Sequence, residues 1–143
     1  AVAAGGTVRG LNAGPLGLSR SGLDGLAGRA RKLGAKGLVW VVVEADGSVR
    51  SPAAKFLSED ERVEVSRHLE GKPGDVLLLV ADRPPIVAKV LGQLRLELGR
   101  PAGHDELAFL WVVEFPVFEE TEEGELAPAH HPFTSPRDVV EMR

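Results

Sequence analysis

Two short apolar runs set the main constraint on how this chain folds. Residues 38–43 (LVWVVV) are all apolar and rich in β-branched side chains, and residues 76–81 (VLLLVA) form a second such run. Both are too short for a buried helix and are predicted to be strands. The first run does not alternate apolar and polar residues, so its strand is predicted to be buried on both faces or nearly so.

Three helices are predicted around these strands, because apolar residues recur there at the spacing of one helical face. The first helix is predicted to begin at the N-cap Ser21, with Asp24 as its capping-box partner, and the second at the N-cap Ser58, with Glu61 in the same role. The pair Pro84 and Pro85 is predicted to open the third helix. Gly34 is predicted to end the first helix in the left-handed conformation.

Shorter segments complete the prediction. Residues 7–11 and 111–115 read as strands, residues 51–56 as a strand-like piece, and the acidic tract 119–125 as a solvent-exposed hairpin tip. The order is β-α-β-β-α-β-α up to about residue 100, followed by a strand-turn-strand piece. This pattern favours an α+β fold, a two-layer sandwich with a largely antiparallel sheet and its helices on one face. Gly99, Pro101 and Gly103 mark a linker, which predicts two domains, 1–103 and 104–143.

The charges divide along the same boundary. Residues 1–100 hold 15 basic and 11 acidic side chains, whereas residues 101–143 hold 2 and 10. The first part could face a polyanion, although an excess of this size is also typical of a solvated mixed-charge surface. Lys36 and Lys55 each lie at the edge of a predicted element and are candidates for phosphate contacts with a nucleic acid, the alternative being ordinary surface lysines.

Several classes of site have no support in the sequence. It contains no dinucleotide-binding glycine pattern, no P-loop and no nucleophile elbow. It has no cysteine, and its four histidines lack a zinc-ligand spacing, so no metal site is predicted. No apolar run approaches the length of a membrane span, and the first residues carry no signal-peptide pattern. The absence of cysteine fits a cytoplasmic protein, and the chain is expected to be part of a longer one.

The strongest functional signal lies near the end of the sequence. Residues 109–119 (FLWVVEFPVFE) predict a buried strand that runs into a turn at Phe115 and Pro116. After an acidic gap, residues 130–136 (HHPFTSP) place two imidazoles and two hydroxyls around a proline-fixed bend. On an extended segment His130 and His131 point to opposite faces, so one can face a cleft while the other lies behind it.

These two motifs together closely resemble the bacterial-type aspartyl-tRNA synthetases, in which a W-V-[VI]-D-F-P-x-F-E strand precedes H-H-P-F-T-[SA]-P. Upstream, the segments GAKGL (34–38), SPAAKFL (51–57), PGD (73–75) and LGQLRL (91–96) resemble the insertion or GAD domain of that family. The resemblance covers essentially the whole chain in the family's order. It implies a GAD-like domain over residues 1–103 and a segment of a class II catalytic domain over residues 104–143.

The resemblance implies a ligase that activates aspartate with ATP and Mg²⁺ and transfers it to tRNA. Carried over by position, His130 would contact the substrate aspartate, and His131, Phe115 and Pro116 would position the loop around it. The chain would not be catalytic alone, because the segments expected to bind ATP and Mg²⁺ lie outside it. The family is also expected to form homodimers through regions not present here.

Two points remain open at the sequence level. Glu114 stands where the family usually has Asp, which keeps the charge but lengthens the side chain. The sequence also leaves open whether the ligase charges the aspartate tRNA alone or the asparagine tRNA as well. The competing hypothesis is a free-standing insertion-type module that binds tRNA or a protein partner without catalysis. The histidine pair argues against it, since such a module has no use for a substrate-pocket imidazole.

Overall fold

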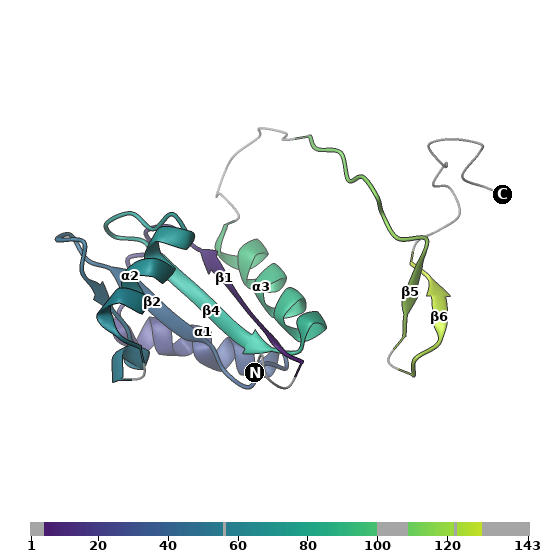
Figure 1. Cartoon of the computed structure of the whole chain (residues 1–143), viewed down its shortest axis with the longest axis horizontal. Helices are drawn as coiled ribbons and strands as arrows, with labels where there is room; N and C mark the ends of the chain where they lie inside the picture. Colours follow the sequence, from purple (N-terminus) through teal and green to yellow (C-terminus); the bar gives the residue numbers. More distant parts are fainter. Residues whose placement is uncertain (1–4, 56, 100–108, 122, 130–143) are drawn as a thin grey trace. The chain divides into compact units, whose positions relative to one another are not determined.

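The computed structural model describes residues 5–55, 57–99, 109–121 and 123–129. The chain divides into two compact units, residues 1–103 and 104–143 (Figure 1). Each unit is described by itself.

The first unit has the element order that the sequence predicts. Its elements are β1 (Thr7–Asn12), α1 (Arg20–Lys32), β2 (Val39–Val43), β3 (Val49–Arg50), the 3-10 helix η2 (Pro52–Lys55), α2 (Glu59–His68), β4 (Val76–Asp82) and α3 (Pro84–Leu98). The prediction of a strand-like piece over residues 51–56 is wrong. The strand β3 ends at Arg50, and Pro52 begins the 3-10 helix η2, a position where the missing backbone N–H of proline loses no hydrogen bond.

The four strands form one antiparallel sheet in the order β1-β4-β2-β3. Leu78 in the central strand β4 lies between Leu11 of β1 and Trp40 of β2. Because β1 and β2 are each antiparallel to β4, they run in the same direction, with β4 inserted between them. The prediction of an α+β fold on a largely antiparallel sheet is confirmed, and β1 and β3 are its edge strands.

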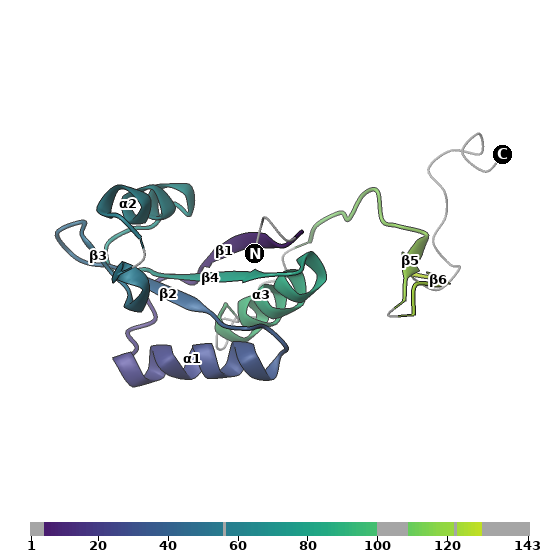
Figure 2. The same cartoon turned by 60° about the horizontal axis from the view of Figure 1, so that its bottom comes forward.

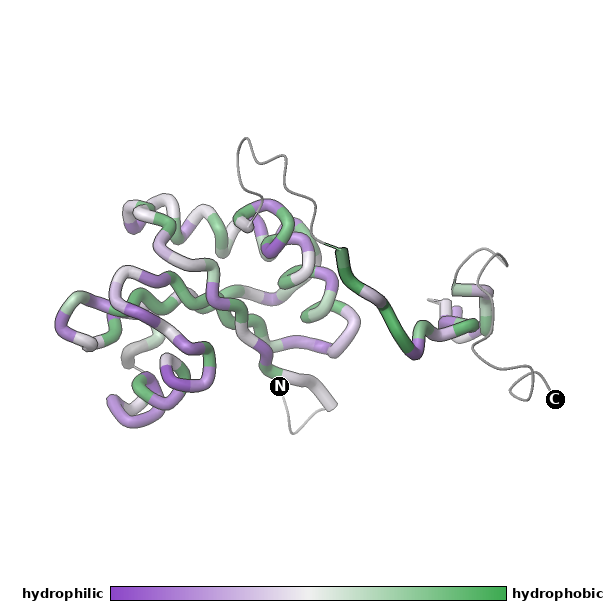
Figure 3. Tube along the Cα trace, turned by 90° about the horizontal axis from the view of Figure 1, so that it is seen from above, coloured by the Kyte–Doolittle hydropathy of each residue, from purple (hydrophilic) through white to green (hydrophobic). Residues whose placement is uncertain are grey.

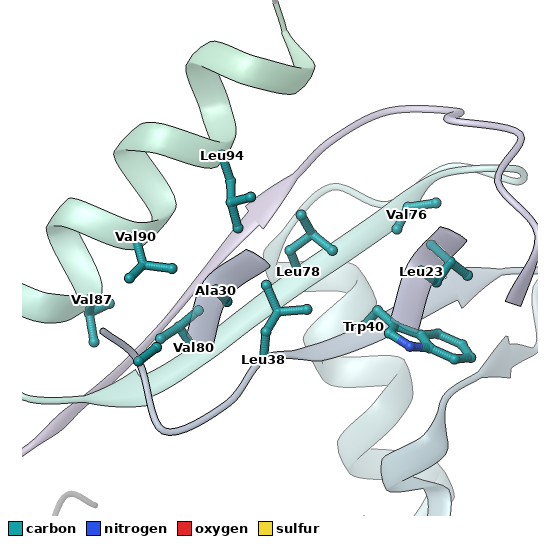
Figure 4. Packing of buried hydrophobic residues seen from close by; sticks show 11 residues of the cluster. Leu23, Ala30, Leu38, Trp40, Val76, Leu78, Val80, Val87, Val90 and Leu94 are labelled. Atoms are coloured by element: carbon teal, nitrogen blue, oxygen red, sulfur yellow. The ribbon is translucent and has the colours of Figure 1, made fainter. Parts of the chain in front are cut away.

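Helices cover both faces of this sheet (Figure 2). On one face, Trp40 and Leu78 pack with Leu23 of α1 and with Val90 and Leu94 of α3 (Figure 4). The other face has a smaller cluster, in which Val41, Val43 and Leu77 contact Val65 of α2 and Leu69 just beyond it. The predicted single helical layer therefore describes α1 and α3 only. The second layer follows from the strand pattern itself, because a strand that is apolar on both sides needs cover on both sides.

The ends of the helices show which local signals the sequence carries. Ser58 and Glu61 form the predicted capping box of α2, and Gly34 follows α1 with a φ of 108°, in the left-handed range. The predicted N-cap of α1 is wrong by two residues. Ser19 is the cap, because its extended backbone lets its hydroxyl accept from the Gly22 N–H. Asp24 instead accepts a hydrogen bond from the Trp40 indole at 3.0 Å.

The second unit contains a hairpin of β5 (Phe118–Glu120) and β6 (Leu126–Pro128). Its turn is the acidic tract, closed by hydrogen bonds from Thr121 N–H to Glu125 O at 2.8 Å and from Gly124 N–H to Thr121 O at 3.0 Å, so the predicted hairpin tip is confirmed. The strand predicted over residues 111–115 is wrong for this structure. Among the described residues, those of this segment belong to neither of the two strands of the second unit, β5 and β6.

Candidate functional site

The apolar segment that opens the second unit is almost fully exposed. Trp111 is 93% exposed and Phe109 90% exposed, and most of the segment has the green of hydrophobic residues along the chain trace (Figure 3). Exposure of this many large apolar side chains in one run is typical of a surface that another part of a protein covers.

A bend follows this segment at Glu114, which has a φ of 55°. The left-handed region is uncommon for residues other than glycine, and aspartate and asparagine tolerate it best. Phe115, half exposed, precedes Pro116 and is therefore restricted to extended backbone. Glu114 and Pro116 together fix the direction of the chain as it leaves the apolar segment.

The hairpin then brings the chain back to this bend. Phe118 lies opposite Pro128, and the N–H of Ala129 donates to the carbonyl of Val117 at 3.0 Å. The residue that precedes the histidine pair in the sequence is therefore hydrogen-bonded to the residue that follows Pro116. His130 and His131 themselves lie outside the described residues.

In the first unit, Lys36 lies on the loop between α1 and β2, and a buried aspartate at the end of β4 holds this loop. One carboxylate oxygen of Asp82 accepts from the Lys36 N–H at 3.0 Å, and the other accepts from the Arg83 N–H at 2.8 Å. The side chains of Lys36 and Arg83 are exposed. Asp82 thus fixes two basic residues from distant parts of the sequence at one edge of the unit. Sequence reasoning missed Asp82 and Arg83; the one available signal was an acidic residue at the end of an apolar strand.

These contacts predict an acid-dependent stability. The N–H donors of Lys36 and Arg83 lower the pKa of Asp82. Because the folded-state pKa is depressed, the stabilisation is complete above the unfolded pKa of about 3.9 and is lost as the pH falls through the lower folded-state pKa. Asp82→Asn, which cannot accept from both N–H groups, is expected to be less stable near neutral pH. Urea unfolding at a series of pH values below about 5 should show a flatter acid dependence in the variant. An identical acid dependence in both proteins would contradict this assignment.

A second buried aspartate performs the same role at the other end of β4. Asp75 accepts from the side-chain amide of Asn12 at 2.9 Å and from the Lys72 N–H at 2.9 Å, and these two donors lower its pKa. Asn12 also donates to the carbonyl of Leu69 at 3.2 Å. This network ties β1, the end of α2 and the turn before β4 together, and sequence reasoning identified only the PGD motif within it.

Lys55, the other predicted tRNA contact, is the last residue of η2. The structure describes its backbone only, so the predicted contact of its side chain lies outside what the structure describes. Within the described ranges, no three His, Asp or Glu side chains are grouped as ligands for a metal ion. In the same part of the chain, no helix has both the length and the apolar character needed to span a bilayer.

Comparison with known proteins extends these observations. Residues 1–91 match the GAD domain family. An aspartate–tRNA(Asp/Asn) ligase of Symbiobacterium thermophilum is 48% identical over 141 residues, covering 95% of this chain and 24% of the ligase. An aspartate–tRNA(Asp/Asn) ligase of Desulfotalea psychrophila is 46% identical, with 94% and 23% covered. An aspartate–tRNA ligase of Ruminiclostridium cellulolyticum is 43% identical, with 96% and 24% covered.

The chain spans about a quarter of the length of these relatives. The family match covers the four-stranded sheet, α1, α2 and half of α3. On this match, over well more than half of its residues, the chain belongs to the GAD domain family.

Proposed function

We propose that this chain is a segment of an aspartate–tRNA ligase, which activates aspartate with ATP and transfers it to tRNA. The observation that carries the proposal is the extent of the similarity. The relative from Symbiobacterium thermophilum is similar over 95% of the chain, well beyond the GAD domain of residues 1–91 and into the second unit. A free-standing binding module would share the first unit alone, so this extent favours the ligase over the alternative.

In this proposal the first unit is the insertion domain and residues 104–143 belong to the catalytic domain. His130 contacts the carboxylate of the substrate aspartate, where a protonated imidazole forms a charge-assisted hydrogen bond. His131, Phe115 and Pro116 position this contact. The hydrogen bond between Ala129 and Val117 supports the arrangement, because it joins the start of the histidine motif to the bend.

The remaining chemistry belongs to parts of the ligase beyond this chain. ATP and Mg²⁺ would be held there, where Mg²⁺ would supply a positive charge that offsets the charge of the phosphates. The residues of this chain hold and orient aspartate, which is how positioning contributes to in-line displacement. The exposed apolar run at residues 109–113 is covered by the rest of the catalytic domain. The full-length ligase is proposed to be a cytoplasmic homodimer that associates through regions outside this chain.

The test is to isolate the native polypeptide that carries this sequence. We expect a mass roughly four times the 15.2 kDa of the chain, together with pyrophosphate exchange into ATP that requires aspartate. A polypeptide of about 15 kDa without exchange activity would contradict the ligase and favour the binding module.

The proposed tRNA contact makes a separate prediction. Lys36→Glu combined with Lys55→Glu in the full-length ligase is expected to weaken tRNA binding. It should also make the slope of log K against log salt shallower by about 1 to 2, because each lost phosphate contact removes somewhat less than one released counterion. Filter binding at several salt concentrations measures both quantities. Arg20→Glu with Lys89→Glu is the control, since it makes the same charge change on other exposed positions. Equal slopes in the two double variants would leave Lys36 and Lys55 as surface lysines.

A further inference from the structure

A groove runs along the edge of the first unit between β1 and α3, which lie side by side (Figure 1). It has a volume of about 550 Å³. Helix α3 presents two stripes: Val87, Val90 and Leu94 are buried against the sheet, while the neighbouring stripe faces the groove. The lining from α3 consists mainly of Pro84, Pro85, Ala88, Leu91, Gly92 and Arg95.

The groove exposes backbone groups that can pair with another strand. β1 is an edge strand that pairs only with β4 in the described sheet. The N–H of Ala13 donates to the carbonyl of Val76 at 2.9 Å. In an antiparallel ladder the direction of these groups alternates along the strand. The backbone groups of Leu11 and Arg9 therefore face β4, and those of Gly10 and Val8 face outward. Gly10 itself lines the groove.

Two arginines give the groove its charge. Arg9 from β1 and Arg95 from α3 both line it, and both are exposed. Among the described residues neither guanidinium group forms a hydrogen bond or an ion pair, in contrast to that of Arg29, which pairs with Glu97 across α1 and α3. Within the described part of the chain, no acidic side chain lines the groove. Two guanidinium groups without carboxylate partners, set over an apolar surface of Leu11 and Leu91, favour a ligand that is both apolar and acidic.

The residue types that line the groove favour a peptide ligand over a nucleic acid. Sites for single-stranded RNA place aromatic side chains against the bases, and none of the described residues that line this groove is aromatic. An exposed strand edge beside apolar side chains is the arrangement that binds extended peptides by strand addition, in which main-chain hydrogen bonds give affinity and the side-chain contacts give specificity.

We propose that the groove between β1 and α3 binds an extended acidic peptide segment of a partner protein, which adds to the sheet as a fifth strand beside β1. The peptide backbone pairs with the outward groups of Val8 and Gly10. Its carboxylates bind Arg9 and Arg95, and its apolar side chains lie on Leu11 and Leu91. The groove belongs to the first unit and shares no residue with the proposed aspartate site, so the two proposals can be tested independently.

The test uses the full 143-residue chain and a fluorescent eight-residue peptide of alternating glutamate and valine, with binding measured by anisotropy. Arg9→Glu combined with Arg95→Glu is expected to weaken binding at least tenfold. Gly92→Phe should weaken it to a similar degree without changing charge, because space around Gly92 is open and the new ring fills the groove. Arg20→Glu with Arg31→Glu, the same charge change on the exposed surface of α1, should leave binding unchanged.

Two further probes separate strand addition from simple charge attraction. A peptide with every backbone nitrogen methylated has no N–H left to donate to β1 and is expected to bind at least tenfold more weakly, and a lysine–valine peptide should not bind. Equal binding of the methylated peptide, or unchanged binding by the Arg9→Glu/Arg95→Glu variant, would overturn the proposal. Displacement of the acidic peptide by a short single-stranded RNA at equal concentration would also overturn it, in favour of a nucleic-acid surface.

Discussion

In the full-length ligase, His130→Ala is expected to raise the KM for aspartate about tenfold to a hundredfold and to leave the KM for tRNA nearly unchanged. This increase in the KM for aspartate corresponds to the loss of about 1.5–3 kcal/mol of binding free energy, the contribution of one hydrogen bond to a charged group. Such a hydrogen bond exists only where the imidazole contacts the substrate, so the effect should be specific for aspartate. Steady-state pyrophosphate exchange and aminoacylation measure the two KM values separately.

Two variants sharpen this test. His68→Ala is the matched control, because His68 is an exposed histidine of α2 whose ring nitrogen lies 3.2 Å from Glu64, and it should leave both KM values unchanged. His130→Gln keeps a hydrogen-bond donor but cannot carry a positive charge, so it should give an intermediate KM for aspartate. Equal increases in both KM values for His130→Ala would show a general loss of structure and would remove His130 from the aspartate site.

Leu77→Ala is expected to lower the free energy of unfolding of the first unit by about 2–5 kcal/mol, the usual cost of emptying a buried leucine site. Leu77 is fully buried and points to the α2 face of the sheet, where Val41 and Val43 surround it. The prediction therefore tests the second helical layer directly. Trp40 is buried in the first unit whereas Trp111 is exposed in the second, so urea unfolding followed by fluorescence reports mainly on the first unit.

The control for Leu77→Ala is Val8→Ala on the neighbouring strand β1. Val8 is half exposed, and its truncation is expected to change the free energy of unfolding by no more than about 0.5–1 kcal/mol. If Leu77→Ala were as mild as Val8→Ala, α2 would not cover this face of the sheet, and the single-layer arrangement expected from the sequence would be restored.

The order of elements in the first unit could be predicted because strong local signals mark each one. The capping box at Ser58 and the proline pair at Pro84 begin helices where the structure has them. The face that each helix covers could not be predicted in the same way. In α2 no residue is fully buried, and Val63 is 51% exposed although it is apolar. So sparse an apolar stripe does not indicate a face, and the non-alternating pattern of residues 38–43 was the only sign that both faces are covered.

The candidate site residues, too, could be predicted from the sequence only in part. Lys36 could be chosen from the sequence as a basic residue at an element edge. Its link to Arg83 depends on the carboxylate of Asp82, which lies 46 residues beyond Lys36 in the sequence. The predicted strand at residues 111–115 failed for a different reason. Its apolar pattern specifies burial, whereas the structure leaves these side chains exposed and the described segment outside β5 and β6, and the pattern alone does not say where a partner strand lies.

The proposed assignment of this chain to a ligase for aspartate and tRNA can be tested directly on the full-length protein. The protein is incubated with ATP, Mg²⁺, tRNA and each of the twenty labelled amino acids in turn, and the label attached to tRNA is measured. We expect attachment of aspartate alone, and its loss when ATP is omitted. Attachment of another amino acid in preference to aspartate, or of none, would contradict it.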